Sequence, residues 1–346
     1  MKRVLFRILV LLVGIGIGLI SLELFLRINP KFGYNYSALR FKNKNLKCLN
    51  ADNFRYIRPS KLLAYEIIPN CRDGLPSASN SYGLIGKEYR LEKDKNTFRI
   101  LLLGDSIAWQ DGIRQFLEEM LNNNSSLNSK YKFEIWNAGC PSYDVRRYYL
   151  YLKYRGLNYK PDMVMIFLFM NDFKLNINVY YKNQSGITEY YFPISEISKR
   201  YNVSPFLMKQ SYLYRFIILR LDSYLLSKKK SKGINQLEED GRYYLQMIKG
   251  ICEKNNIPLF LVVFPYLKPM SEYEPYQSHG YRIILKVIKE LELNYLNLSK
   301  YLYKEDLYSL RYEKEDEIHP SPKGHHIIAE IIYKHLLDKN FLMPSR

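Results

Sequence analysis

A serine, an aspartate and a histidine in this chain have the side-chain types that nucleophilic catalysis requires. Ser106 follows the apolar run Ile100–Leu103, and Asp316 precedes His319 by three residues near the C-terminus. A serine hydroxyl is a poor nucleophile until a base takes its proton, and a neutral imidazole can accept that proton and return it to a leaving alcohol. Asp316 can hold the imidazole in the required tautomer from the same loop. The three residues therefore predict acyl transfer through a serine.

Two further candidate residues follow strand-like segments. Gly139 comes after Lys132–Asn137, and Asn171 comes after Met163–Met170. Continuous apolar runs of this kind are typical of buried parallel strands, and α/β sheets bind ligands at the carboxyl ends of such strands. Each residue also has a simpler interpretation: Gly139 as a turn, and Asn171 or Ser106 near the start of a helix as a cap. Their combination with Asp316 and His319 is what favours a catalytic site.

The chain order Ser106, Gly139, Asn171, Asp316-x-x-His319 resembles the four signature blocks of the SGNH (GDSL-type) hydrolase superfamily. The resemblance implies a Ser106–Asp316–His319 triad. It also implies an oxyanion hole made by the backbone N–H groups of Ser106 and Gly139 and by the side-chain amide of Asn171. Donors of this kind stabilise the negative charge that develops on the attacked carbonyl.

The resemblance extends over about Phe98–Leu337 and departs from the family pattern at two positions. Ile107 stands where many members have leucine, which is a conservative change. Phe169 stands where the third block often has glycine, and we expect it to alter the shape of the pocket near the oxyanion side chain. The chemistry itself is unaffected by either departure.

Alternating strand and helix patterns predict the fold. Hydrophobic periodicity and turn residues place strands at 97–103, 132–137, 163–170, 258–264 and 294–297, and helices at about 113–121, 145–154, 236–254, 279–292 and 322–337. Such alternation implies right-handed crossovers and a parallel sheet covered on both faces. We therefore predict a three-layer α/β/α sandwich with a five-stranded parallel sheet in the SGNH/flavodoxin-like order. No G-x-G-x-x-G motif follows the first strand, which argues against a nicotinamide enzyme.

The N-terminus predicts a membrane anchor. Lys2, Arg3 and Arg7 precede the uncharged apolar stretch Ile8–Leu22, and no small-residue cleavage site follows it. We interpret residues 1–27 as an uncleaved signal anchor, with the basic end in the cytoplasm and the catalytic domain extracytoplasmic, either periplasmic or at the cell surface. A buried core helix is the alternative.

The remaining chain divides into a linker and pre-domain at 28–96 and a hydrolase domain at 97–340. The segment Asn80–Glu88 resembles the N-S-x-G-x-x-G-x-E stretch that precedes the nucleophile in membrane-anchored SGNH-like proteins. We expect it to pack the pre-domain against the catalytic sheet. Residues at about 173–235 read as an insertion, and we hypothesise that it shapes the acyl or glycan pocket because it follows Asn171 directly.

Charge and cysteine content limit the partners. The 52 basic and 34 acidic residues give a net charge of +18, which suggests an anionic membrane surface or polysaccharide, or only solvated basic faces. No Arg-rich arm or zinc-finger spacing is present, so we do not expect a nucleic-acid partner. The four cysteines form no C-x-x-C pair, and no motif requires a metal or a cofactor. Cys48 and Cys71 can form a disulfide if the domain lies outside the cytoplasm.

The sequence leaves three functions open. The first is a membrane-anchored serine esterase, a lipase-like hydrolase or deacetylase that acts on an acylated envelope glycan or lipid. The second is an O-acyltransferase that uses the same residues, with a sugar hydroxyl in place of water. The third is a glycan-binding or assembly protein that retains the fold without catalysis, and the intact set Ser106, Asp316 and His319 argues against it.

Overall fold

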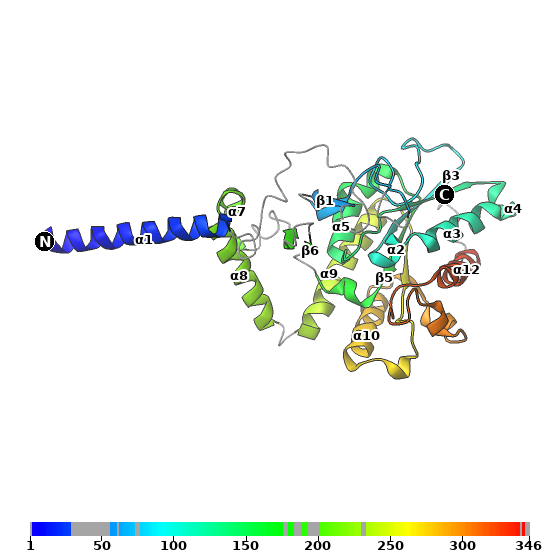
Figure 1. Ribbon diagram of the computed structural model, residues 1–346. Coiled ribbons are helices and arrows are strands. Elements are labelled where there is room, and N and C mark those ends of the chain that lie inside the picture. Colours follow the sequence, from blue (N-terminus) through cyan, green and yellow to red (C-terminus); the bar gives the residue numbers. More distant parts are fainter. Residues whose placement is uncertain are drawn as a thin grey trace. The chain divides into compact units, whose positions relative to one another are not determined.

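The computed structural model describes residues 2–28, 56–60, 62–72, 77–175, 179–182, 188–191, 201–229, 233–339 and 341–342. The chain divides into two compact units (Figure 1). Residues 1–65 and 177–232 form what we call the N-terminal unit, and residues 66–176 and 233–346 form what we call the sheet unit. Each unit is described separately.

A five-stranded parallel sheet forms the centre of the sheet unit. Its spatial order is β4 (Lys132–Asn137), β3 (Thr97–Leu103), β5 (Met163–Leu168), β8 (Leu259–Val263) and β9 (Asn294–Asn297). Every neighbouring pair in it is parallel. The first strand along the chain thus lies second in space, which is the flavodoxin-like order. The predicted sheet, its strands and its order are confirmed.

The strands form because their residues are apolar on both sides. All seven residues of β3 and all six of β5 are buried. Phe98, Ile100 and Leu102 belong to the main hydrophobic cluster on one face, and Leu101 and Leu103 are equally buried on the other. A strand covered on both faces reads as a continuous apolar run, and this is the pattern that predicted it.

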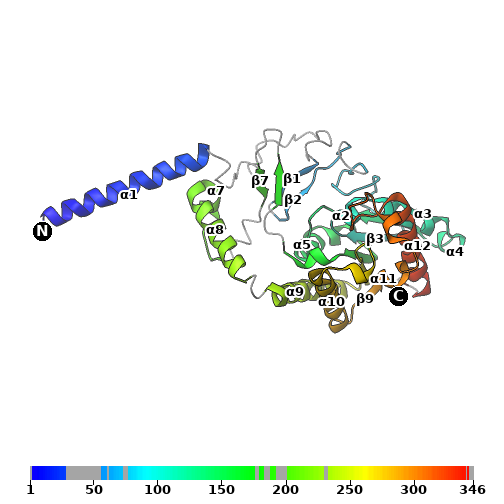
Figure 2. The same cartoon turned by 60° about the horizontal axis from the view of Figure 1, so that its bottom comes forward.

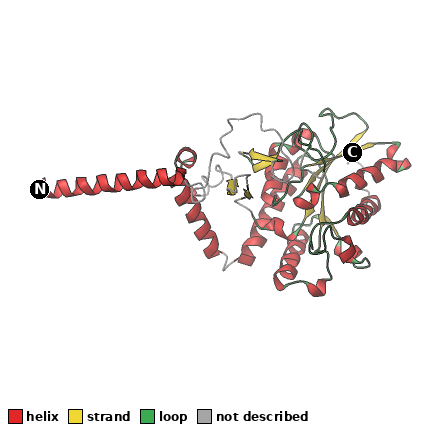
Figure 3. Cartoon of the chain, in the orientation of Figure 1, coloured by secondary structure: helices red, strands yellow, loops and turns green. Residues whose placement is uncertain are grey.

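Helices cover both faces of the sheet (Figure 3). The long helices of this unit are α3 (Gly112–Asn123), α5 (Val145–Tyr154), α9 (Gly233–Lys254), α10 (Pro275–Glu290) and α12 (Pro322–Asp338). Helices α3 and α12 pack against each other and contribute to the main cluster, whereas α5, α9 and α10 pack together. The molecule therefore has the predicted three layers.

The short elements of the sheet unit connect these layers. They are α2 (Ser106–Trp109), α4 (Ser125–Asn128), η3 (Gly156–Tyr159), η4 (Met170–Phe173), η6 (Met270–Glu272), α11 (Ser299–Leu302) and η7 (Leu307–Leu310). The Asn-rich composition of residues 122–130 predicts a loop, but the structure places α4 within it. The Asn124 side chain accepts hydrogen bonds from the N–H groups of Ser126 and Leu127 and so caps this turn of helix.

The segment Asn80–Glu88 packs against the end of strand β4, as its sequence suggested. The Ile85 N–H donates to the Asn137 carbonyl oxygen at 2.8 Å, and Gly83 and Gly86 have φ values of 76° and 109°. Only glycine adopts such values without strain. A short two-stranded sheet of β1 (Ile57–Ser60) and β2 (Ala64–Ile67) precedes this segment.

The N-terminal unit contains α1 (Lys2–Ile28), α7 (Pro205–Gln210), α8 (Tyr212–Lys229) and the hairpin of β6 (Val179–Lys182) and β7 (Thr188–Tyr191). Helix α7 lies at the C-terminal end of α1 in both views (Figure 2). Within the described part of the chain, α1 is the one helix long and apolar enough to cross a membrane. Parts of the expected insertion, including residues 192–200, lie outside the described residues.

The cysteines differ in state. Cys71 is buried and disulfide-bonded. Cys140 and Cys252 are buried free thiols. Cys48, the partner that the sequence suggested for Cys71, lies outside the described residues.

Candidate active site

Ser106, His319 and Asp316 form a continuous hydrogen-bonded chain. The Ser106 Oγ lies 2.8 Å from the His319 Nε2, and the His319 Nδ1 lies 2.7 Å from the Asp316 Oδ2. Residues 213 positions apart in the sequence therefore meet at one site. The serine, imidazole and carboxylate have the relative arrangement in which a proton can pass from the hydroxyl to the ring.

The sheet edge positions the serine. Ser106 is the first residue of α2, which starts directly after β3 at its carboxyl end. The Asp105 side chain accepts the Ile107 N–H at 2.9 Å and so caps this helix. The hydroxyl is thus presented at the edge where parallel sheets bind ligands.

A pinned loop between η7 and α12 positions the histidine. The Tyr312 N–H donates to the His319 carbonyl oxygen at 2.8 Å, and the Ser321 N–H donates to the Leu310 carbonyl oxygen at 2.7 Å. The Ser321 side chain then accepts the Gly324 N–H and starts α12. Both ends of the loop are therefore fixed by backbone hydrogen bonds.

The same loop keeps Asp316 ionised. Burial acts to raise the pKa of Asp316, but its Oδ1 accepts the N–H groups of His319 and Ile318, each at 3.0 Å. These bonds and the bond from the imidazole outweigh burial, so the pKa of Asp316 lies below its usual value. An ionised Asp316 selects the tautomer with hydrogen on Nδ1, which leaves Nε2 free to accept the serine proton.

Asn171 lies beside the serine, at the end of β5. Its Nδ2 donates to the Asp105 Oδ2 at 3.3 Å, and that same carboxyl oxygen lies 3.4 Å from the Ser106 Oγ. An amide nitrogen carries two hydrogens, so one remains for a ligand. The structure therefore brings Ser106, Asp316, His319 and Asn171 to one site.

The Gly139 N–H, expected to face the substrate oxygen, already has an acceptor within the protein. It donates to the Asn137 Oδ1 at 2.9 Å. The Asn137 amide in turn donates to the Ala108 carbonyl oxygen at 2.7 Å and to the Asp111 Oδ1 at 2.9 Å. A ligand oxygen at the Gly139 N–H has to share this hydrogen with Asn137. The sequence analysis missed Asn137, and its place at the end of a predicted strand beside Gly139 was the available signal.

Gly139 has no room for a side chain. A Cβ atom there would lie 2.7 Å from the Ala108 Cβ and 2.7 Å from the Trp109 backbone nitrogen. The loop after β4 can therefore approach the helix that carries Ser106 only with glycine at this position.

The comparison with protein families agrees with this geometry. The family model described as GDSL-like Lipase/Acylhydrolase matches residues 100–332, more than half of the chain. The chain belongs to the GDSL-like lipase/acylhydrolase family. It is therefore an ester-bond hydrolase by family. A search of curated proteins gives no significant match.

The chain also has a low similarity to several solved structures. One is the lipase/acylhydrolase from Enterococcus faecalis, with 15% identity, a TM-score of 0.42, and coverage of 72% of this chain and 100% of that one. Another is Axe2, an acetylxylan esterase from Geobacillus stearothermophilus, with 14% identity, a TM-score of 0.44, and coverage of 70% and 96%.

The Phe169 side chain lies in the core of this GDSL-like hydrolase. Its ring is 1% exposed and belongs to the hydrophobic cluster. It packs edge-on against Tyr266, with ring centroids 4.9 Å apart. The bulk that replaces the usual glycine is therefore accommodated in the core.

A group of buried carboxyl groups lies behind the triad. Burial raises the pKa of Asp172 well above its usual value, and the negative charge of Asp105 adds to the shift. Burial also raises the pKa of Asp105, although the Ile107 N–H and the Asn171 amide oppose it. Asp144, which also acts on Asp172, is paired with Arg147 at 2.6 Å. No motif in the sequence identified this arrangement.

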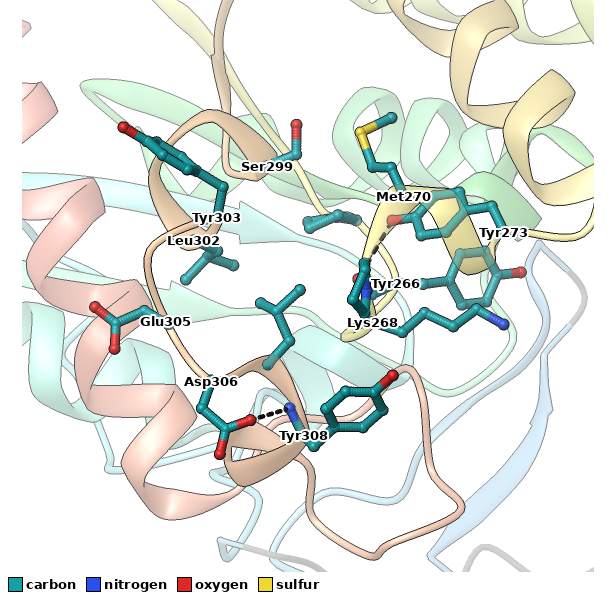
Figure 4. A pocket seen from close by; sticks show the side chains of 13 residues that line it. Tyr266, Lys268, Met270, Tyr273, Ser299, Leu302, Tyr303, Glu305, Asp306 and Tyr308 are labelled. Atoms are coloured by element: carbon teal, nitrogen blue, oxygen red, sulfur yellow. Dashed lines mark hydrogen bonds between the residues drawn. The ribbon is translucent and has the colours of Figure 1, made fainter.

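A cavity lined by tyrosines adjoins the catalytic loop of the hydrolase (Figure 4). Its volume is about 420 Å³, within the range of small-molecule sites. The lining side chains include Tyr266, Lys268, Met270, Tyr273, Tyr303, Glu305, Asp306 and Tyr308. The Lys268 Nζ lies 2.8 Å from the Glu317 Oε2, and the Leu267 N–H donates to the Glu317 carbonyl oxygen at 2.7 Å. The wall that contains Lys268 is therefore bonded to Glu317, the residue after Asp316.

Proposed function

We propose that this protein is a membrane-anchored serine esterase in which Ser106 is the nucleophile, His319 the general base and acid, and Asp316 the carboxylate that orients the ring. The observation that carries the proposal is the chain of short hydrogen bonds, 2.8 Å from Ser106 to His319 and 2.7 Å from His319 to Asp316. Ser106 and His319 exchange the proton, and Asp316 orients the imidazole and stabilises the imidazolium that forms.

The reaction follows from this arrangement. The Ser106 oxygen attacks the ester carbonyl as its proton moves to the His319 Nε2, and the carbonyl oxygen becomes negative. We assign three donors to this negative oxygen. They are the second amide hydrogen of Asn171, the backbone N–H of Ser106, and the backbone N–H of Gly139, which is shared with Asn137. His319 then gives its proton to the leaving alcohol. Water, deprotonated by His319, releases the acyl group from Ser106.

The tyrosine-lined cavity favours a glycan ester as the substrate. A pyranose ring has apolar C–H faces and a polar rim, so it fits aromatic faces interspersed with charged groups. Tyr303 is 67% exposed, and it and Glu305 lie at one edge of the group of side chains that line the cavity (Figure 4). Lys268, Glu305 and Asp306 add charged groups to this lining, and these can bind sugar hydroxyls but not a hydrocarbon chain. We therefore place a sugar unit of an acylated envelope glycan in this cavity.

Two features support an extracytoplasmic location. Helix α1 has the length and composition of a membrane span and begins after a basic terminus. Cys71 is disulfide-bonded, and such bonds persist in oxidising compartments. We propose that α1 anchors the chain and that the hydrolase works outside the cytoplasm.

Fluorophosphonate labelling of the full-length protein in detergent tests the proposal. We expect the label on Ser106, located by mass spectrometry, and its loss in His319→Ala. The matched control is His326→Ala, an exposed histidine on α12 that leaves the triad untouched. A folded protein that takes no label and hydrolyses no aryl acetate contradicts the proposal. Labelling with acyl transfer to an added oligosaccharide, and no release to water, identifies a transferase instead.

A further inference from the structure

The end of helix α1 is bonded to the start of helix α8 by one carboxylate. The Glu23 side chain accepts the N–H groups of Tyr212 at 3.0 Å and Leu213 at 2.7 Å, and the Ser211 hydroxyl at 2.9 Å. The first N–H groups of a helix have no acceptor within the helix, and a negative charge there is favourable. Glu23 therefore caps α8 from a distant part of the sequence.

Arg27 adds a second connection. Its guanidinium donates to the Gln210 carbonyl oxygen at 3.0 Å, to Glu23 at 2.7 Å, and lies over the Tyr212 ring. Leu26 is 2% exposed, although nearly all of α1 before it is exposed. The last turn of α1 is thus a built contact with α7 and α8, not a free helix end.

Helix α8 leaves an apolar stripe uncovered. Ile217, Leu221, Tyr224 and Leu225 are each between 38% and 53% exposed. Their spacing of i, i+4, i+7 and i+8 places them on one face of the helix. Ile218 and Leu219 are buried on the other side, and Phe206 on α7 is exposed as well. An exposed stripe of this length on a short helix marks an interaction surface.

The length of α1 determines the depth of this surface. A bilayer core requires about 20 helical residues, and Glu23 stands 21 residues after Lys2. A helix that spans the core therefore brings Glu23 to its far boundary, where headgroups and water begin. Because Glu23 binds the first turn of α8, α8 starts at the same boundary.

We infer that α7 and α8 lie in the membrane interface, with the stripe of Ile217, Leu221, Tyr224 and Leu225 turned into the lipid. The inference rests on the proposed membrane anchoring by α1. By sequence position, Arg220 borders this stripe, and Lys228 and Lys229 follow it in the last turn of the helix. Basic residues next to an apolar surface are typical of helices that rest on anionic lipid.

Quenching by brominated lipid tests the inference on the full-length chain. The protein is reconstituted in vesicles of phosphatidylglycerol and phosphatidylcholine, with or without bromine on the acyl chains. Leu221→Trp and the more conservative Tyr224→Trp report on the stripe, Leu12→Trp reports on α1, and Tyr276→Trp is an exposed control on α10. The emission of Trp109 and Trp136 in the parent protein is subtracted.

We expect bromine to reduce the emission of Leu12→Trp, Leu221→Trp and Tyr224→Trp by about twofold or more, and that of Tyr276→Trp much less. Quenching at position 12 without quenching at 221 and 224 overturns the inference and leaves the anchoring intact. Absence of quenching at all three positions contradicts the anchoring itself. Tryptophans at 221 and 224 that are shielded from both brominated lipid and aqueous iodide indicate a protein partner, such as a second copy, and also overturn it.

Discussion

Asp316 and Asp172 are the same residue type close to the same site, and their environments shift their pKa values in opposite directions. Asp316 lies on a loop, accepts two backbone N–H groups and an imidazole, and its pKa is lowered. Asp172 is fully buried, accepts the Phe169 N–H at 2.8 Å, and burial raises its pKa well above the usual value. The difference lies in depth and in the number of donors, not in sequence.

The comparison separates a carboxyl group that supports chemistry from one that supports the scaffold. In the proposed mechanism, an ionised Asp316 favours the imidazolium that forms when His319 takes the serine proton. Asp172 instead holds the turn after β5, which carries Asn171, and burial favours its protonated form. The predictions below test whether these two roles are as distinct as the geometry indicates.

The largest expected effect is that of Asp316→Asn. The amide cannot stabilise the imidazolium and favours the wrong tautomer, so we expect kcat for aryl acetate hydrolysis to fall by about 10⁴-fold with the fold retained. Asp338→Asn, at the exposed end of α12, is the matched control. Asp172→Asn should retain kcat within about tenfold. A loss of the same size in Asp172→Asn would show that the buried carboxyl also takes part in the reaction.

Asn171→Ala tests the donor that Asp105 and the Asp172 turn hold in place. We expect kcat to fall by about 10²–10³-fold with little change in KM, since the lost bond is made to the transition state. Asn255→Ala, in an exposed position, is the control. An unchanged kcat would assign the charge of the carbonyl oxygen to the backbone N–H groups alone.

Sequence patterns predicted an element of the fold well where a single signal, such as a continuous apolar run, determined it. Strand β3 contains the continuous apolar run Ile100–Leu103 and is buried along its length, and its bounds at Thr97–Leu103 were predicted correctly. Helix α4 was missed because a cap by Asn124 outweighed a composition typical of a loop. Motif order brought Ser106, Asp316 and His319 together, and their distances agree with that order.

The features that the sequence did not predict depend on contacts between residues that lie far apart in the chain. The place of Asn137 at a strand end only hinted at its hydrogen bond with the Gly139 N–H, and no pattern in the sequence indicates that Asp105 accepts the Asn171 amide. The charge of Glu23 in an apolar helix had no explanation until the start of α8 was found beside it. Contacts of this kind arise only when the chain has folded, since each joins residues on different elements.

A smaller effect is expected at the tyrosine-lined cavity. We expect Tyr303→Ala to raise KM for an acetylated oligosaccharide by about fivefold, which corresponds to about 1 kcal/mol of lost aromatic contact. KM for a small aryl acetate should not change, because that substrate has no sugar unit to occupy the cavity. Tyr303→Phe should keep most of the binding, and Tyr276→Ala is the control outside the cavity. Equal changes for both substrates would place the effect at the triad instead.

The smallest effect on the reaction, and the sharpest test of the comparison, is the pH dependence of stability. Unfolded aspartate has a pKa of about 3.9. The folded pKa of Asp172 is raised. Its stabilising contribution is therefore complete below about pH 3.9, the unfolded pKa, and is lost as the pH rises through the folded pKa. Asp316 has a lowered folded pKa, so its contribution is present above about pH 3.9 and is lost as the pH falls through the folded value.

Urea unfolding from pH 3 to 8 should therefore show opposite changes in the stability of the two variants relative to the parent protein. At the alkaline end, Asp172→Asn should unfold at a higher urea concentration than the parent. At the acid end, the stability of Asp316→Asn should fall less steeply with decreasing pH than that of the parent. Parallel curves for the two variants would mean that Asp172 is ionised in the folded protein, and the distinction between the two carboxyl groups would then rest on position alone.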